Sequence, residues 1–459
     1  MTAPALETSP FHRELNPESD LGGPPVETPV RWPLWQRVLF RFFFTYLALH
    51  IAPWGFFAGL APIRAILAPL DVVERWAVFA ANSRFFHVRE TLVMPNGSGD
   101  TSYMYAQFYL FLSLAAITCV VWSVLDRKRA SYGRLLYWLR LSVRYYITIA
   151  ALSYGIIKIF ALQMFFPTIS QLATPLGDLL PMRFSWLFIG YSVPYQTFAG
   201  VMEFTAGVLL LYRRTVTAGL LAALGAFANV VMINLSYDVP VKLYASHLLF
   251  CCLFLLALDY RRLVSFFVMN QATPGTAAYD WPFGKPWQRY GGMAVKALML
   301  WMILVTPLYN SWKRYESLKR PPAAGPFKVG VYNVTSYARK RGATPVLQAD
   351  SMMWKDVIFD NAGAGSVNTK DPVFTRRYGR GYFRFKPDTS ARTVAVWKTS
   401  TIPGDSTFLF TMRYAVPDTT RIQFWTAISG DSLFVELART NRHFQLTERQ
   451  FHWLSEYNR

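Results

Sequence analysis

The sequence predicts a polytopic α-helical membrane protein with about seven transmembrane helices, followed by a C-terminal extracytoplasmic β-rich domain of sandwich type. Three observations predict this fold class. The 459 residues are 53% hydrophobic and 17% aromatic but only 16% charged, and the mean hydropathy is +0.20, which is typical of membrane proteins. Long apolar runs occupy most of the chain before residue 322, and short alternating runs follow it.

Apolar runs long enough to cross a bilayer, which takes about twenty helical residues, predict the spans. They lie at 36–60, 103–125, 143–166, 195–212, 215–235, 242–260 and 293–311. Residues 1–30 are polar, Pro-rich and without an apolar core, so we expect a disordered tail rather than a secretory signal. Charged residues at loose helical spacing over 63–90 predict an amphipathic helix on the membrane surface. The segment RFSWLFIGYSVPYQ (183–196) predicts a re-entrant or interfacial piece.

Basic residues set the expected orientation. Arginines flank the start of the first span, and the basic segments at 126–140, 212–215 and 259–263 fall on the same side of the membrane. The positive-inside rule makes that side cytoplasmic. We therefore expect a bacterial-type inner-membrane protein with a cytoplasmic N-terminus and an extracytoplasmic C-terminal domain. These flanking residues also explain the net charge of +20, so we do not expect nucleic acid as a partner.

Domain boundaries follow from the same runs. We expect two spans and their connecting helix over 31–142, a four-helix unit over 143–263, a linker and the seventh span over 264–321, and the β-rich domain over 322–459. Runs such as TFLFTMRYAV, separated by turn signals such as PDTT, predict the strands of that domain. Its stretch TRRYGRGYFR (375–384) is expected to place exposed arginines at a sheet edge.

A lysine interrupts the apolar run SYGIIKIF. A charge at the bilayer centre costs about 2.5–3.5 kcal/mol or more, so Lys158 is expected to face the interior of the bundle. At about 1.5 Å per residue, Lys158 on the third span and Glu203 on the fourth reach the same depth in the outer half of the bilayer. We predict a polar pocket near the outer leaflet with these two as its catalytic pair. Further substrate-binding candidates at that level are Tyr154, Asn229, Asn234 and His247.

Structural alternatives accompany each of these residues. A Lys–Glu pair can simply join two helices, and a lysine near the boundary can extend to the head groups. His247 is expected to be structural, and a His50–His247 haem pair is conceivable although the two depths match poorly. No metal-ligand cluster is predicted. The cysteines, Cys119, Cys251 and Cys252, lie in apolar runs without a C-x-x-C motif and are expected to be buried small hydrophobes.

The motifs YGIIKIF (154–160) and GVMEFTAGVLLLYRRT (200–215) resemble two elements of the DoxX-like membrane family, G-x-x-K and G-x-x-E-x-x-x-G-x-L-L-L. The resemblance covers about 143–263. It implies a four-helix bundle and association with quinone-linked or thiol-linked oxidoreductase systems. The matching positions are Lys158, Glu203 and Gly207.

A weaker resemblance, in layout, is to the transmembrane domain of vitamin K-dependent carboxylase-like (HTTM) proteins. These also combine several spans and a lysine motif similar to YGIIK with an extracytoplasmic β-rich tail. The other motifs of that family have no clear match here. This resemblance implies a lysine that acts as a base on a quinone-like or lipid substrate.

The expected function is that of a membrane subunit of a quinone-linked oxidoreductase system, which binds a quinone or a lipid head group in the outer-leaflet pocket. Lys158 would donate a hydrogen bond to a carbonyl or carry a proton. Quinone is the cofactor that fits this function, and membrane lipids are the expected surroundings. Two alternatives stay open: a non-catalytic scaffold whose β domain binds an envelope protein partner, and a lysine-base carboxylase-like enzyme.

Overall fold

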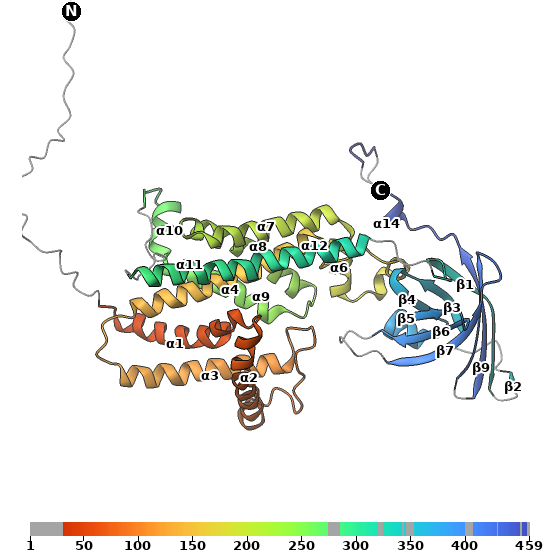
Figure 1. The fold of residues 1–459 in the computed structure, drawn as a ribbon, viewed down its shortest axis with the longest axis horizontal. Coiled ribbons are helices and arrows are strands. Elements are labelled where there is room, and N and C mark those ends of the chain that lie inside the picture. The colour runs from red at the N-terminus through yellow and green to blue at the C-terminus, as the bar shows by residue number, and fades with distance from the viewer. Residues whose placement is uncertain are drawn as a thin grey trace, which may run out of the picture.

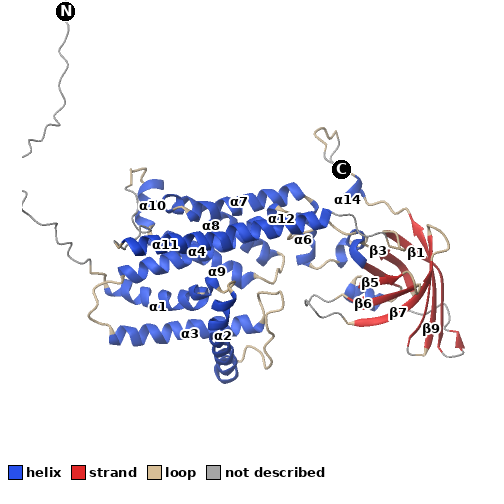
Figure 2. Cartoon of the chain, in the orientation of Figure 1, coloured by secondary structure: helices blue, strands red, loops and turns tan. Residues whose placement is uncertain are grey.

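The computed structural model describes residues 31–273, 285–319, 325–341, 344–345, 353–399, 407–428, 430–449 and 452–456. The tail expected at 1–30 lies outside these residues. The long helices form one part of the molecule, and the strands form the other together with the short helices α13 (Pro372–Tyr378) and α14 (Gln445–Glu448) (Figure 2). Most of the long helices lie side by side along one direction, and the strands lie beyond one end of them (Figure 1).

The helical part begins at residue 34 and ends at residue 319. Its main helices are α1 (Leu34–Ile51), α2 (Ala61–Ala81), α3 (Ser102–Leu125), α4 (Gly133–Ile159), α5 (Ile169–Leu172), α6 (Pro181–Tyr191), α7 (Val193–Leu211), α8 (Val216–Ser236), α9 (Lys242–Leu258), α10 (Tyr260–Phe267), α11 (Pro286–Leu300) and α12 (Thr306–Lys319). The expected helix at 63–90 is present as α2, which points away from the direction of the bundle (Figure 1). The segment expected to be re-entrant or interfacial contains α6 and the start of α7.

Fewer helices than expected can cross a membrane on length and composition. Within the described residues there are four such helices, or five if α9 and α10, bent by 78°, form one span. The expected count of seven is therefore not reached, although the chain has the apolar helices of a membrane protein. When the bent pair is counted as a span, the two expected spans that do not qualify are α4 and α7, because charged side chains such as Arg144 and Lys158 on α4 and Glu203 on α7 lower the hydropathy of these helices.

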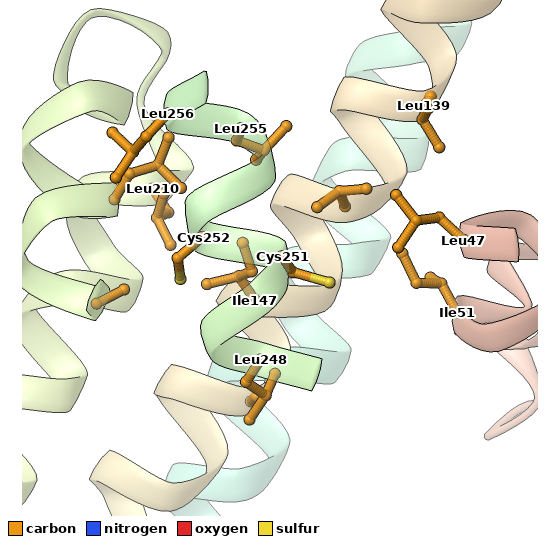
Figure 3. Packing of buried hydrophobic residues seen from close by; sticks show 14 of the residues in the cluster. Leu47, Ile51, Leu139, Ile147, Leu210, Leu248, Cys251, Cys252, Leu255 and Leu256 are labelled. Carbon is orange, nitrogen blue, oxygen red and sulfur yellow. The ribbon is translucent and has the colours of Figure 1, made fainter. Parts of the chain in front are cut away.

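The core of the bundle forms where α1, α4, α7, α8 and α9 meet. Leu47, Ile147, Leu210 and Leu255 are completely buried there. Cys251 and Cys252 are free and buried on α9, and their side chains point in different directions into this core (Figure 3). As expected for neighbours on a helix, they pack as small hydrophobes and do not face each other as a dithiol.

The C-terminal domain is a closed antiparallel barrel and not a sandwich. Its strands are β1 (Gly330–Arg341), β2 (Thr344–Pro345), β3 (Trp354–Phe359), β4 (Ala364–Thr369), β5 (Gly381–Asp388), β6 (Thr393–Lys398), β7 (Phe408–Ala415), β8 (Arg421–Ile428) and β9 (Asp431–Thr440). From β3 to β9 each strand pairs with the next, β1 pairs with β3, the short β2 pairs with the end of β1, and β1 also pairs with β9 from Val331 to Arg341. That last pairing joins the two edges of the sheet, so eight strands form a ring.

Side chains fill the barrel. An eight-stranded ring encloses a space just wide enough for side chains, and here Phe327, Tyr332, Phe359, Phe424 and Leu437 are among the residues that occupy it. Alternation of buried and exposed positions along the strands was predicted correctly. The pattern is the same in a sandwich and in a barrel, so it did not predict the closure.

A buried polar contact joins the barrel to the bundle. The short helix α5 lies in the connection between α4 and α6, and its Ser170 is completely buried. The backbone N–H of Ser170 donates to Asp360 Oδ1 at 3.2 Å, and Ser366 Oγ donates to Ser170 Oγ at 2.7 Å. Ala173 packs beside them against Val331 and other apolar residues of the barrel. The segment that follows α4 is therefore fixed to the barrel, at the end of the bundle that is nearer to it.

Candidate functional site

Two glycines allow the backbones of α4 and α7 to come into contact. A Cβ atom added to Gly155 would lie 2.6 Å from the backbone nitrogen of Phe204, and one added to Gly200 would lie 2.7 Å from that of Ile159. Real Cβ atoms do not come so close, so only glycine fits at these positions. Because the helices touch here, the side chains beside these glycines on the two helices are held at one level.

Lys158 and Glu203 form a buried ion pair at that level. Lys158 Nζ donates a hydrogen bond to Glu203 Oε1, and the two residues are 8% and 3% exposed. The other carboxylate oxygen, Glu203 Oε2, is buried and has no hydrogen-bond partner among the described residues. A buried acceptor of a charged group without a donor is unfavourable by more than about 1–3 kcal/mol. The pair expected from the sequence is thus present, and one of its atoms lacks a partner.

The ion pair forms part of the wall of a cavity of about 650 Å³. The cavity lies between α4, α6, α7, α8 and α9, and Tyr154, Asn229 and Asn234 line it together with Lys158 and Glu203. Five of the six residues predicted from their depth therefore meet around one space. Most of the other lining residues are apolar or aromatic, as in sites for small organic molecules.

The cavity is open on one side of the bundle, between α7 and α8. Residues spaced three or four apart along one face of each helix line the cavity and are also exposed. These residues are Tyr195, Phe198 and Met202 on α7, and Leu221, Gly225 and Asn229 on α8. The cavity is therefore reached from the side of the bundle, between these two helices.

Two glutamines that were not among the predicted site residues complete the wall nearest the barrel. Gln196, fully buried at the start of α7, accepts a hydrogen bond from the backbone N–H of Met164 at 3.0 Å and donates one to its carbonyl at 2.7 Å. This holds the turn after α4 against α7. Gln163, the residue before Met164, lines the cavity, and its Oε1 is buried without a partner among the described residues. Glutamines inside apolar runs were a signal that could have identified both.

His247 is the predicted residue that lies elsewhere. Its Nδ1–H donates to the carbonyl of Leu243 at 2.7 Å, so Nε2 accepts a hydrogen bond from the hydroxyl of Tyr46. Its ring stacks on that of His50, with the centroids 3.9 Å apart and the planes 17° apart. The expectation that the two histidines differ in depth was therefore wrong. Face-to-face stacking does not suit two axial ligands of one haem, and the pair is part of the packing between α1 and α9.

Metal binding has no support in the described part of the chain, since no group of three or more His, Cys, Asp or Glu side chains there could hold an ion.

Asn234 has a structural bond besides its place at the cavity, because its Nδ2 donates to the carbonyl of Val241 at 3.3 Å. This contact closes the turn between α8 and α9. Asp100 adds to it by accepting the backbone N–H groups of Lys242 and Leu243, each at 2.9 Å, and so caps α9.

Comparison with known proteins gives one relative. No family model matches the chain, and no solved structure matches it. The chain is similar to the uncharacterized protein YwoB of Bacillus subtilis (strain 168), with 37% identity over 83 residues, which is 18% of this chain and 54% of that protein. The chain thus matches about half the length of this curated relative.

Proposed function

We propose that the cavity binds the head group of a membrane-soluble quinone, and that the chain is a membrane subunit of a quinone-linked redox system. The observation that carries this proposal is the buried Lys158–Glu203 pair in the wall of a cavity that is open towards the bilayer. The DoxX-like resemblance of the same helices points to the same chemistry.

An ion pair in this position is better explained by a ligand than by stability. Apolar residues of similar volume often replace a buried ion pair with no loss of stability, because removing two charges from water is costly. Glu203 uses only one of its oxygens within the described protein, and an ammonium has three N–H donors of which Glu203 takes one. The pair can therefore both donate to and accept from a head group.

The same geometry weighs against the two alternatives. A lysine that acts as a base needs a nitrogen that is free to take a proton from the substrate, whereas Lys158 Nζ is engaged in a hydrogen bond with Glu203, which disfavours the lysine-base enzyme. A scaffold protein has no need of a cavity of about 650 Å³ with polar groups in its wall. Binding of an envelope partner by the barrel stays a separate prediction.

The proposed placement puts the cavity in the outer half of a bacterial inner membrane. The turn at Gln163 and Met164 lines the cavity and leads to α5, which contacts the barrel. Basic segments such as 126–140 lie at the opposite end of α4 and favour the cytoplasm there. With this orientation the barrel lies outside the cytoplasm, and a lipid of the outer leaflet meets the opening between α7 and α8.

Organic extraction and mass spectrometry of the purified full-length protein test the proposal. Wild type is compared with Lys158→Met and with Gly225→Phe, which fills the cavity from α8, where a Cβ meets no atom within 4 Å. We expect a quinone in the wild-type extract and its loss from both variants, with thermal unfolding measured to show that they fold. Identical extracts from three folded proteins would reject the proposal.

A further inference from the structure

Two residues of the cavity wall each have a buried hydrogen-bond acceptor that lacks a donor among the described residues. Glu203 Oε2 and Gln163 Oε1 are both buried without a partner among the described residues, and both side chains line the same cavity. Glu203 is only 3% exposed, so bulk water does not reach its carboxylate freely. These two atoms come from different segments of the chain, α7 and the turn after α4.

A carboxylate oxygen can only accept hydrogen bonds. The carbonyl oxygen of a quinone can only accept as well, so it cannot satisfy Glu203 Oε2 or Gln163 Oε1. The hydroxyl of a hydroquinone donates one hydrogen bond and can still accept another from the Lys158 ammonium. The reduced head group therefore complements both charges of the ion pair, whereas the oxidised one complements only Lys158.

We infer that the cavity selects the reduced, hydroxyl-bearing form of its ligand, with Glu203 as the acceptor of the phenolic O–H and Lys158 as the donor to the same head group. This inference rests on the proposed function and adds the redox state of the ligand. It requires no chemical step on the protein. For a two-electron couple, each tenfold preference for the reduced form raises the midpoint potential of the bound couple by about 30 mV.

Equilibrium binding to the full-length protein in detergent, without oxygen, tests the inference. The probes are a short-chain benzoquinone, its hydroquinone and the dimethyl ether of that hydroquinone, which keeps the ring and oxygens but has no O–H. The fluorescence of Trp186, a lining residue, can be compared with calorimetry as a readout. A hydrogen bond to a charged group predicts that the hydroquinone binds about ten to a hundred times more tightly than the other two.

Glu203→Gln provides a sharper version of the same test. The amide keeps an oxygen for Lys158 and puts an N–H₂ donor where Oε2 was, so the preference should shrink or reverse in favour of the quinone. Glu74→Gln is the matched control, because it makes the same substitution on α2, whose residues do not line the cavity. It should leave the order of the three affinities unchanged.

The possible outcomes separate this inference from the proposed function. Equal affinities of wild type for hydroquinone, quinone and ether would overturn the inference and leave the binding site for quinones in place. No binding of any probe would overturn the proposed function and the inference with it. Thermal unfolding shows whether Glu203→Gln folds. If it does not fold, the order of the three affinities measured with the wild-type protein decides whether the inference holds.

Discussion

Both halves of the chain bury an ion pair, and the two pairs have different surroundings. In the barrel, Arg380 is 4% exposed and bonds to Asp356, and its Nε donates to Ser366 Oγ at 2.8 Å. Asn368 approaches the second oxygen of Asp356 at 3.5 Å. In the bundle, Glu203 has a partner for one oxygen only and lies beside a cavity. The first pair is completed by its neighbours, whereas the second leaves an acceptor for a molecule from outside.

The difference separates a structural pair from a binding site, although both look alike in a sequence. Ser366 also bonds to Ser170 of α5, so the barrel pair belongs to the contact between barrel and bundle. Residues of the turn that precedes α5 line the cavity. The structural pair thus supports the wall in which the other pair lies.

Breaking the barrel pair should have the largest effect on stability. Arg380→Leu leaves the carboxylate of Asp356 buried and unpaired, which should lower the free energy of unfolding by about 3–5 kcal/mol. Denaturant unfolding of the full-length protein measures this. Arg421→Leu is the control, since its partner Asp418 and Arg421 itself are largely exposed, and a much smaller loss is expected. Similar losses in the two variants would contradict the structural role of Arg380.

Separating α4 from α7 should have the next largest effect. In Gly155→Ala the new methyl group would meet the backbone of Phe204 at 2.6 Å, which a flexible side chain cannot relieve. The helices must move apart, with an expected loss of about 1–3 kcal/mol in unfolding free energy and weaker binding of the short-chain hydroquinone. Gly225→Ala meets no atom within 4 Å and should be neutral or stabilising by up to about 1 kcal/mol. If both alanines were tolerated, the contact would not position the ion pair.

Replacing both members of the bundle pair should have the smallest effect on folding. Lys158→Met together with Glu203→Leu removes both charges and leaves no buried carboxylate, so the unfolding free energy should stay within about 1 kcal/mol of wild type or rise. Binding of the hydroquinone should be lost. Lys158→Met alone should be less stable than the double variant because Glu203 is then unpaired. A double variant that unfolds readily would show that the pair holds the bundle together.

The depth of each polar residue along its helix was predictable from the sequence. Apolar runs fix where a helix enters the bilayer, and a constant rise per residue then places Lys158, Glu203, Tyr154, Asn229 and Asn234 near one level. The alternation after residue 322 predicted the strands, whereas the family resemblance of the motifs around Lys158 and Glu203 and the orientation from the basic segments stay predictions. Each of these features depends only on residues that are close together in the sequence, so a single sequence is enough to predict it.

Tertiary structure decided which way each helix faces and how the ends of the sheet meet. His247 has a suitable depth, but the rotation of α9 turns it towards His50 and Tyr46. Arg380, expected at an exposed edge, is buried because α5 of the bundle packs on that part of the barrel. Closure of the ring depends on pairing between β1 and β9, about a hundred residues apart. Such contacts depend on packing between distant segments, and local patterns in the sequence do not contain them.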